Sequence, residues 1–144
     1  MGREIRFRAW DKNERVMIDW LCMVQTAFNR TGDQSYGIMY MILSGNHHNF
    51  EVMQYTGLKD KNGKEIYEGD VVQTYDQNNL IEFINGSFMV IGQHPDRYMK
   101  NYSHIKSYLF DLSIPDMEGS RYDGVTTDLL IVGNIYKNPE LVKV

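Results

Sequence analysis

The sequence has little of what secreted or membrane-spanning proteins need. Its single cysteine, Cys22, excludes an internal disulfide and gives no sign of an oxidising compartment. Cys22 stands among apolar residues, so we expect it to be buried as a small hydrophobic side chain. No apolar run approaches the roughly 20 residues of a membrane-spanning helix, and residues 1–10 lack a signal-peptide core. We therefore expect a cytoplasmic protein with no membrane partner.

Positive charge is also scarce in this chain. Lysine and arginine number 15 against 19 acidic residues, which gives a formal net charge of −4. General binding to polyanions rests on many unopposed cations, so this balance excludes a sequence-general nucleic-acid binder. A local basic surface is still compatible with it.

The residues that are present favour β-structure, with aromatic residues at 12% of the chain. Residues Glu4–Trp10 alternate between apolar and polar side chains, with Ile5 on the apolar face and Arg6 and Arg8 on the other. This period of two predicts a half-buried strand. The polar segment Asp11–Glu14 then predicts a turn.

The apolar run Val16–Val24 leaves two interpretations open. Its position after the turn favours a second strand, which would complete an N-terminal hairpin. Met17, Leu21 and Val24 also share helical spacing, which fits the start of a short helix. We prefer the strand. The secondary structure of residues 21–49 and 93–128 as a whole is not determined by the sequence.

Lys61-Asn62-Gly63-Lys64 is the clearest local signal, a tight turn between two strand-like flanks. Asn62-Gly63 fits a type I′ turn. Alternatively, Asp60 opens a type I turn and Gly63 takes the left-handed position of a G1 bulge. Both geometries place Gly63 at a positive φ that a Cβ would oppose.

Short strands and turns follow at close spacing, which is typical of a small antiparallel sheet or barrel. The expected strands are Val71–Tyr75, Leu80–Ile84, Ser87–Gly92 and Leu129–Val132, the last buried on both faces. The expected turns are Glu68–Asp70, Asp76–Asn79 and Asn85–Gly86. Asn138-Pro139 predicts one terminal helical turn, since proline suits the first helical position.

Three segments resemble the YopX family of phage and prophage proteins. They are residues Arg3–Asp11, Met53–Asp70 and Ile131–Leu141, and they occur in the family's order. The resemblance implies an N-terminal β region at residues 1–53, followed at residues 54–144 by a small SH3-like β-barrel with little helix. The two parts could also form one compact unit. The resemblance implies a phage or prophage origin in bacteria, but it carries no activity and no catalytic residues.

The residues themselves offer no established chemistry. The histidines lack the spacings of zinc sites, although His94, Asp96 and His104 could converge through a loop; we expect solvated histidines instead. Nucleophile elbows and phosphate-binding loops are missing. We expect Asp70 to bond backbone amides in its turn. The expectation is a protein that is not an enzyme, with no catalytic, cofactor-binding or metal-binding residues.

Two binding functions remain. Nucleic acid could be contacted by Arg6, Arg8, Lys59, Lys61 and Lys64, although a solvated strand face and turn explain these residues equally well. Self-association is favoured by apolar segments such as Tyr36–Leu43 and by nine methionines, which suit adaptable contacts. We expect an oligomeric scaffold or regulatory binding protein, with nucleic-acid binding as the alternative. Nothing in the sequence indicates whether it binds a small molecule.

Overall fold

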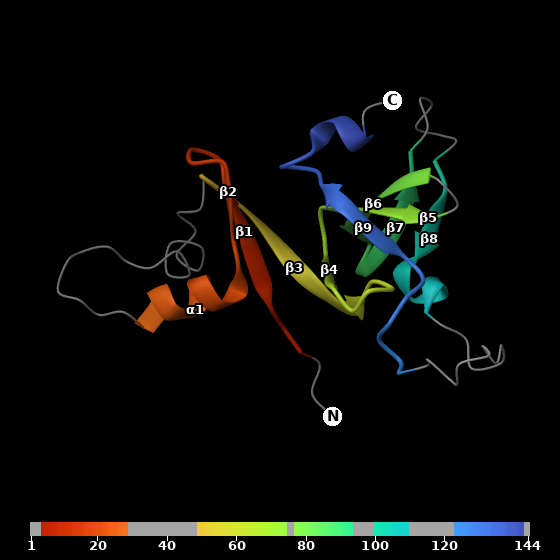
Figure 1. Cartoon of the computed structure of the whole chain (residues 1–144), viewed down its shortest axis with the longest axis horizontal. Helices are drawn as coiled ribbons and strands as arrows, with labels where there is room; N and C mark the ends of the chain where they lie inside the picture. The colour runs from red at the N-terminus through yellow and green to blue at the C-terminus, as the bar shows by residue number, and fades with distance from the viewer. Residues whose placement is uncertain (1–3, 29–48, 75–76, 94–99, 110–122, 143–144) are drawn as a thin grey trace. The chain divides into compact units, whose positions relative to one another are not determined.

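The computed structural model describes residues 4–28, 49–74, 77–93, 100–109 and 123–142. Across these residues it contains nine β-strands and one α-helix, which confirms the mostly β composition expected from the sequence (Figure 1). Backbone contacts divide the chain into an N-terminal unit, Ile5–Gln54, and a second unit formed by Tyr55–Val144 together with Met1–Glu4. Each unit is described by itself.

The N-terminal unit is built on an antiparallel hairpin. Strands β1 (Phe7–Asp11) and β2 (Val16–Ile18) pair, and the first half of β3 (Phe50–Lys59) pairs with the other edge of β1. The Asp11 carboxylate accepts hydrogen bonds from the backbone N–H groups of Asn13 and Glu14 at 2.9 and 3.0 Å. These bonds close the predicted turn, because a short acidic side chain can satisfy the exposed amides of the bend.

The preferred strand over Val16–Val24 is wrong beyond Ile18. Helix α1 spans Trp20–Phe28, as the helical spacing of Leu21 and Val24 had indicated. Asp19 explains the switch, because its Oδ1 accepts the backbone N–H of Cys22 at 2.8 Å and so caps the helix. A strong N-cap at this position ends the strand after three residues.

The core of this unit gathers Ala9, Ile18 and Met23, with Phe7 and Phe50 packed against them. Met23 is buried in the first helical turns, whereas Leu21 and Cys22 beside it face outward. Cys22 is consequently exposed, which corrects the expectation that it would be buried. Ile5 precedes β1 and is also exposed, so the predicted apolar face begins at Phe7.

The second unit is a small β-barrel-like fold. The second half of β3 pairs with β4 (Glu65–Tyr67), and five further strands form a curled half-barrel in the order β8-β7-β6-β5-β9. The strands are β5 (Asp70–Thr74), β6 (Gln77–Ile84), β7 (Ser87–Gly92), β8 (Tyr102–His104) and β9 (Leu130–Asn134). Two 3-10 helices, η2 (Ile105–Tyr108) and η3 (Pro139–Val142), complete the unit. This architecture confirms the predicted fold class.

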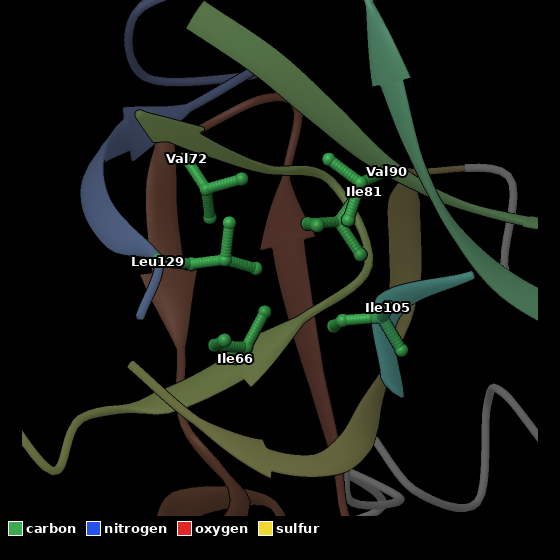
Figure 2. Close-up of a cluster of buried hydrophobic side chains, with 6 residues drawn as sticks. All are labelled: Ile66, Val72, Ile81, Val90, Ile105 and Leu129. Carbon is green, nitrogen blue, oxygen red and sulfur yellow. The ribbon is translucent and has the colours of Figure 1, made fainter. Parts of the chain in front are cut away.

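An aliphatic core fills the inner face of the half-barrel. Figure 2 shows six buried side chains pointing toward one another from separate segments of the unit: Ile66, Val72, Ile81, Val90, Ile105 and Leu129. The predicted strand Ser87–Gly92 and the terminal turn at Pro139 are both confirmed. The I′-type turn at Asn85–Gly86 is confirmed as well, because both residues have positive φ.

Two predictions for this sheet are wrong in detail. Residues Gln77–Asn79 belong to β6 rather than to a turn, because they pair with the end of β5. Val132 is 37% exposed, so β9 is not buried on both faces. The strand lies at the edge of the five-stranded sheet, where one face alone meets the core.

The Lys61–Lys64 hairpin adopts the G1-bulge alternative. Gly63 has a φ of +84°, whereas Asn62 does not lie at positive φ, which rules out type I′. The Gly63 N–H donates to the Asp60 carbonyl at 2.9 Å, and the Asp60 N–H donates to the Lys64 carbonyl at 2.8 Å. A type I turn with glycine in the left-handed position gives this pair of bonds.

Asp60 is buried at the base of this hairpin. Its Oδ1 accepts the backbone N–H groups of Asn62 and Lys64, each at 2.9 Å. Its Oδ2 accepts the N–H of Ile131 in β9 at 3.2 Å. One carboxylate therefore shapes the turn and ties it to a strand more than 70 residues away.

Replacing Gly63 by valine tests the left-handed geometry of the turn. A Cβ at Gly63 would meet no atom within 4 Å, so the cost lies in the backbone and not in a steric clash. We expect G63V to lower the free energy of unfolding by about 1 kcal/mol or more, because a β-branched residue opposes positive φ. Urea unfolding measures this, with Gly63→Asn as the milder control. Equal stability of G63V and the parent chain would contradict the geometry.

Replacing Asp60 by asparagine tests the buried carboxylate. The amide retains one acceptor oxygen but presents an NH₂ group to the Ile131 N–H, so a buried donor loses its partner. We expect a loss of about 1–3 kcal/mol in unfolding free energy. Asp128→Asn removes the same charge from an exposed residue and serves as the matched control. Equal effects of the two substitutions would show that the carboxylate geometry is unimportant.

Candidate functional site

A polar cleft opens on the sheet of the second unit. Its volume is about 280 Å³, somewhat below the range of drug-sized ligand pockets and suited to one small chemical group. The lining side chains carry mainly amides and hydroxyls. They are Thr74, Gln77, Asn79, Val90, Gly92, Asn101, Tyr102, Ser103 and Tyr108.

The register of the sheet explains why these residues gather. Asn79 of β6 lies opposite both Val72 of β5 and Gly92 of β7. Ser103 of β8 lies opposite Val90. Because side chains alternate along strands, Asn79 and Ser103 share the inner face with the aliphatic core. The cleft is therefore the polar continuation of the face that carries the core.

Asn79 supplies a hydrogen-bond acceptor to the cleft. The residue is 6% exposed, and its Nδ2 donates to the carbonyls of Gln77 and Val72 at 3.0 and 3.5 Å. Among the residues that the structure describes, no donor contacts its Oδ1. A Cβ at Gly92 would lie 3.4 Å from the Cβ of Asn101 and 3.6 Å from this oxygen, so the side chains of Asn79 and Asn101 flank the glycine.

Two tyrosines complete the lining. Tyr102 contributes to the lining from the edge strand β8, but it lies opposite Ile91, so its side chain, 53% exposed, belongs to the face of the sheet opposite to that of Ser103. Tyr108, in η2, is half-buried and packs against the aliphatic core.

Two described carboxyl groups, those of Asp123 and Asp128, have shifted pKa values, and neither is among the residues that line the cleft. A hydrogen bond from the Thr126 hydroxyl, with two backbone amides, lowers the pKa of Asp123 to about 2. Partial desolvation raises the pKa of Asp128, although the residue is exposed overall and its own backbone hydrogen bond and the charge of Lys61 oppose this shift. Both effects belong to the loop that leads into β9. We therefore assign these two groups to the structure of that loop.

The predicted nucleic-acid residues belong to two units, each of which is described by itself. Arg6 and Arg8 are half-buried in the N-terminal unit, and the three lysines belong to the second unit. Lys59 is half-buried at the end of β3, and its backbone bonds to Val125 and Thr127. Only Lys61 and Lys64 of this set are exposed.

The other residues singled out in the sequence are Asp70, the histidines with Asp96, and the apolar segment Tyr36–Leu43. Asp70 bonds the backbone N–H of Tyr67 at 2.8 Å, which confirms its predicted role in a turn. His104 is exposed on β8, whereas His94 and Asp96 lie outside the described residues, as does Tyr36–Leu43. In the described ranges, acidic, histidine and cysteine side chains form no group that could hold a metal ion.

Comparison with known proteins settles the family. A family model described as YopX protein matches residues 6–143. The chain belongs to the YopX family. Among solved structures, this YopX-family chain is similar to protein EF1440 from Enterococcus faecalis, at 25% identity over 99% of this chain and 100% of that one, with a TM-score of 0.44. No curated protein matches it.

Sequence reasoning missed the cleft of this YopX-family chain. Gln77 and Asn79 were expected in a turn, and the segment Lys100–Tyr108 fell in a region without assigned structure. The only available signal was the density of amides and hydroxyls in these two segments.

Within the ranges that the structure describes, none of the helices is both long and apolar enough to cross a membrane.

Proposed function

We propose that this YopX-family chain is a non-enzymatic regulatory binding protein that holds its partner at the Asn79–Tyr102 cleft. The observation that supports this is buried Asn79, which lines an open polar cleft and whose Nδ2 is already bonded to backbone carbonyls, so that its oxygen is left to accept a hydrogen bond. Amides and hydroxyls recognise a neutral polar group by hydrogen bonds. Acidic, histidine and cysteine side chains do not contribute to the described lining, which favours binding over acid–base chemistry.

We further propose that this is a phage or prophage protein that acts in the bacterial cytoplasm. Homo-oligomerisation is part of the proposal. Phe83 is 50% exposed and stacks edge-on against Phe88 across the β6–β7 pair, with ring centroids 4.9 Å apart. Strands β8 and β9 end the five-stranded sheet, and such edges can pair with another chain.

Binding at the cleft is testable with small neutral probes. We expect uridine, N-acetylglycine N′-methylamide or glucose, at millimolar concentration, to shift the backbone amide signals of Asn79, Gly92 and Ser103 in ¹⁵N–¹H spectra. Ser103→Leu should abolish the shifts, because its larger side chain fills the cleft. Ser87→Leu, the same change at a half-buried position of β7 outside the lining, should preserve them. If none of the three probes moves these amides, the cleft is not a binding site.

Self-association is testable by light scattering at micromolar concentration. We expect a mass that is a multiple of the 16.9 kDa chain. Phe83→Lys should shift the mass toward the single chain, because it places a charge on the exposed apolar surface. Glu82→Lys alters the adjacent exposed position on the opposite face and should have a smaller effect. A monomeric mass for the parent chain would contradict the oligomer.

A further inference from the structure

We propose that Asn85 is a site of spontaneous deamidation, a covalent change that adds one negative charge to the turn between β6 and β7. The chain contains the dipeptide Asn-Gly twice, at Asn62–Gly63 and at Asn85–Gly86. All four residues are exposed, and a Cβ at either glycine would meet no atom within 4 Å. Exposure and steric space are therefore alike, and the two sites differ in how each turn is hydrogen-bonded.

The reaction at Asn85 needs water and no other co-reactant. The backbone nitrogen of Gly86 loses its proton to solvent and attacks Cγ of Asn85, which closes a succinimide ring; glycine has no side chain to obstruct this attack. The Cγ–Nδ2 bond breaks, and the nitrogen takes up a proton and leaves as ammonia. Water then opens the ring. Opening at Cγ gives aspartate, whereas opening at the backbone carbonyl gives isoaspartate, whose chain runs through Cβ and Cγ.

The turn at Asn62–Gly63 is held closed against this attack. The nitrogen that would attack, that of Gly63, already donates its N–H to the Asp60 carbonyl at 2.9 Å. The buried Asp60 carboxylate accepts the flanking N–H groups of Asn62 and Lys64, each at 2.9 Å. Its negative charge opposes the loss of a proton from the neighbouring Gly63 nitrogen. Its hydrogen bonds also fix the backbone that must rotate before the ring can close.

The turn at Asn85–Gly86 lacks this restraint. In the described parts of the chain, the Gly86 N–H has no hydrogen-bond partner, and no side chain bonds to either residue of the turn. Asn85 has a φ of +52°, a left-handed conformation that is costly for a residue with a Cβ. Opening this turn disturbs the strand pair at its end, Ile84 with Ser87, and relieves the strained residue. The turn at Asn85 therefore opens at a lower cost than the turn at Asn62.

The two products affect the β6–β7 hairpin differently. Aspartate keeps the backbone length and, like asparagine, tolerates the left-handed conformation, so it adds charge alone. Isoaspartate inserts one carbon into a two-residue loop whose length sets the register of the strands. The pair next to the turn, after Ile84 and Ser87, is Phe83 with Phe88. We therefore expect isoaspartate to loosen the contact between these two rings.

The test is to incubate the whole chain at mildly alkaline pH and to follow both sites by peptide mass spectrometry. Enzymatic methylation of isoaspartate identifies that product. We expect Asn85 to convert at least about tenfold faster than Asn62, because opening the Asn62 turn breaks more hydrogen bonds. In concentrated urea the two rates should converge, because both turns are then absent. An equal ratio of rates in the folded and unfolded chains, or an intact Asn85 in the folded chain, would overturn the proposal.

Asp60→Ala tests the protection at Asn62 directly. The variant removes the carboxylate, so it should raise the rate at Asn62 and leave the rate at Asn85 unchanged. An unchanged rate at Asn62 would contradict protection by Asp60 and overturn the contrast between the two turns. If both rates rise to their values in urea, the variant has unfolded, and the comparison of the folded and unfolded parent chains decides.

Asn85→Asp is the matched control for the effect on the hairpin. It adds the charge without the extra backbone carbon, so we expect it to melt at the temperature of the parent chain. The isoaspartate product, separated by ion exchange, should melt at a lower temperature. Equal melting of this product and Asn85→Asp would overturn the expected loosening of the hairpin.

Discussion

The carboxylate of Asp60 lies almost fully buried and accepts hydrogen bonds from three backbone N–H groups. Two of these donors shape the Lys61–Lys64 turn, and the third belongs to β9. A buried carboxylate is costly unless its oxygens are satisfied, so this arrangement requires the turn and the strand together. Local turn geometry and the long-range closure of the barrel unit are thereby coupled through one side chain.

A second acidic residue, Asp70, also joins a local bend to strand β9, whose Asn134 lies 64 residues further along the chain. Asp70 accepts the Tyr67 N–H and also lies 3.5 Å from the Asn134 amide nitrogen. The adjacent Gly69 carbonyl accepts the N–H of Ile135 at 2.8 Å. Residues Met53–Asp70 and Ile131–Leu141 carry the resemblance to the YopX family, and these contacts join the two segments. Much of the family signature in them is therefore accounted for by architecture.

The cleft lies where the inner face of the half-barrel changes from aliphatic to polar side chains. Along β6, buried Ile81 is followed on the same face, toward the start of the strand, by Asn79 and Gln77. The aliphatic side chains pack together, whereas the polar end lines an open space. Asn79 satisfies its amide hydrogens with backbone carbonyls and directs its oxygen to the cleft, so the same residue serves the sheet and the site.

Local backbone chemistry made several elements of this protein predictable from the sequence. Asn85–Gly86 and Gly63 mark positive φ, Asp11 and Asp70 bond nearby amides, and Pro139 begins a helical turn. The Asp19 cap that starts α1 was also a local signal, but the apolar pattern around it was ambiguous between strand and helix. These features depend on residues within a few positions of one another.

The sequence by itself thus determined the family, the β class and the positions of most tight turns, because each follows from residues close together in the chain. Tertiary structure alone decided that Asp60 would bond Ile131, that Val132 would be exposed at a sheet edge and that Asn79 would face Gly92 and Ser103 across a cleft. These outcomes depend on strand order and register. Register joins segments far apart in sequence, and no local pattern specifies which of them become neighbours.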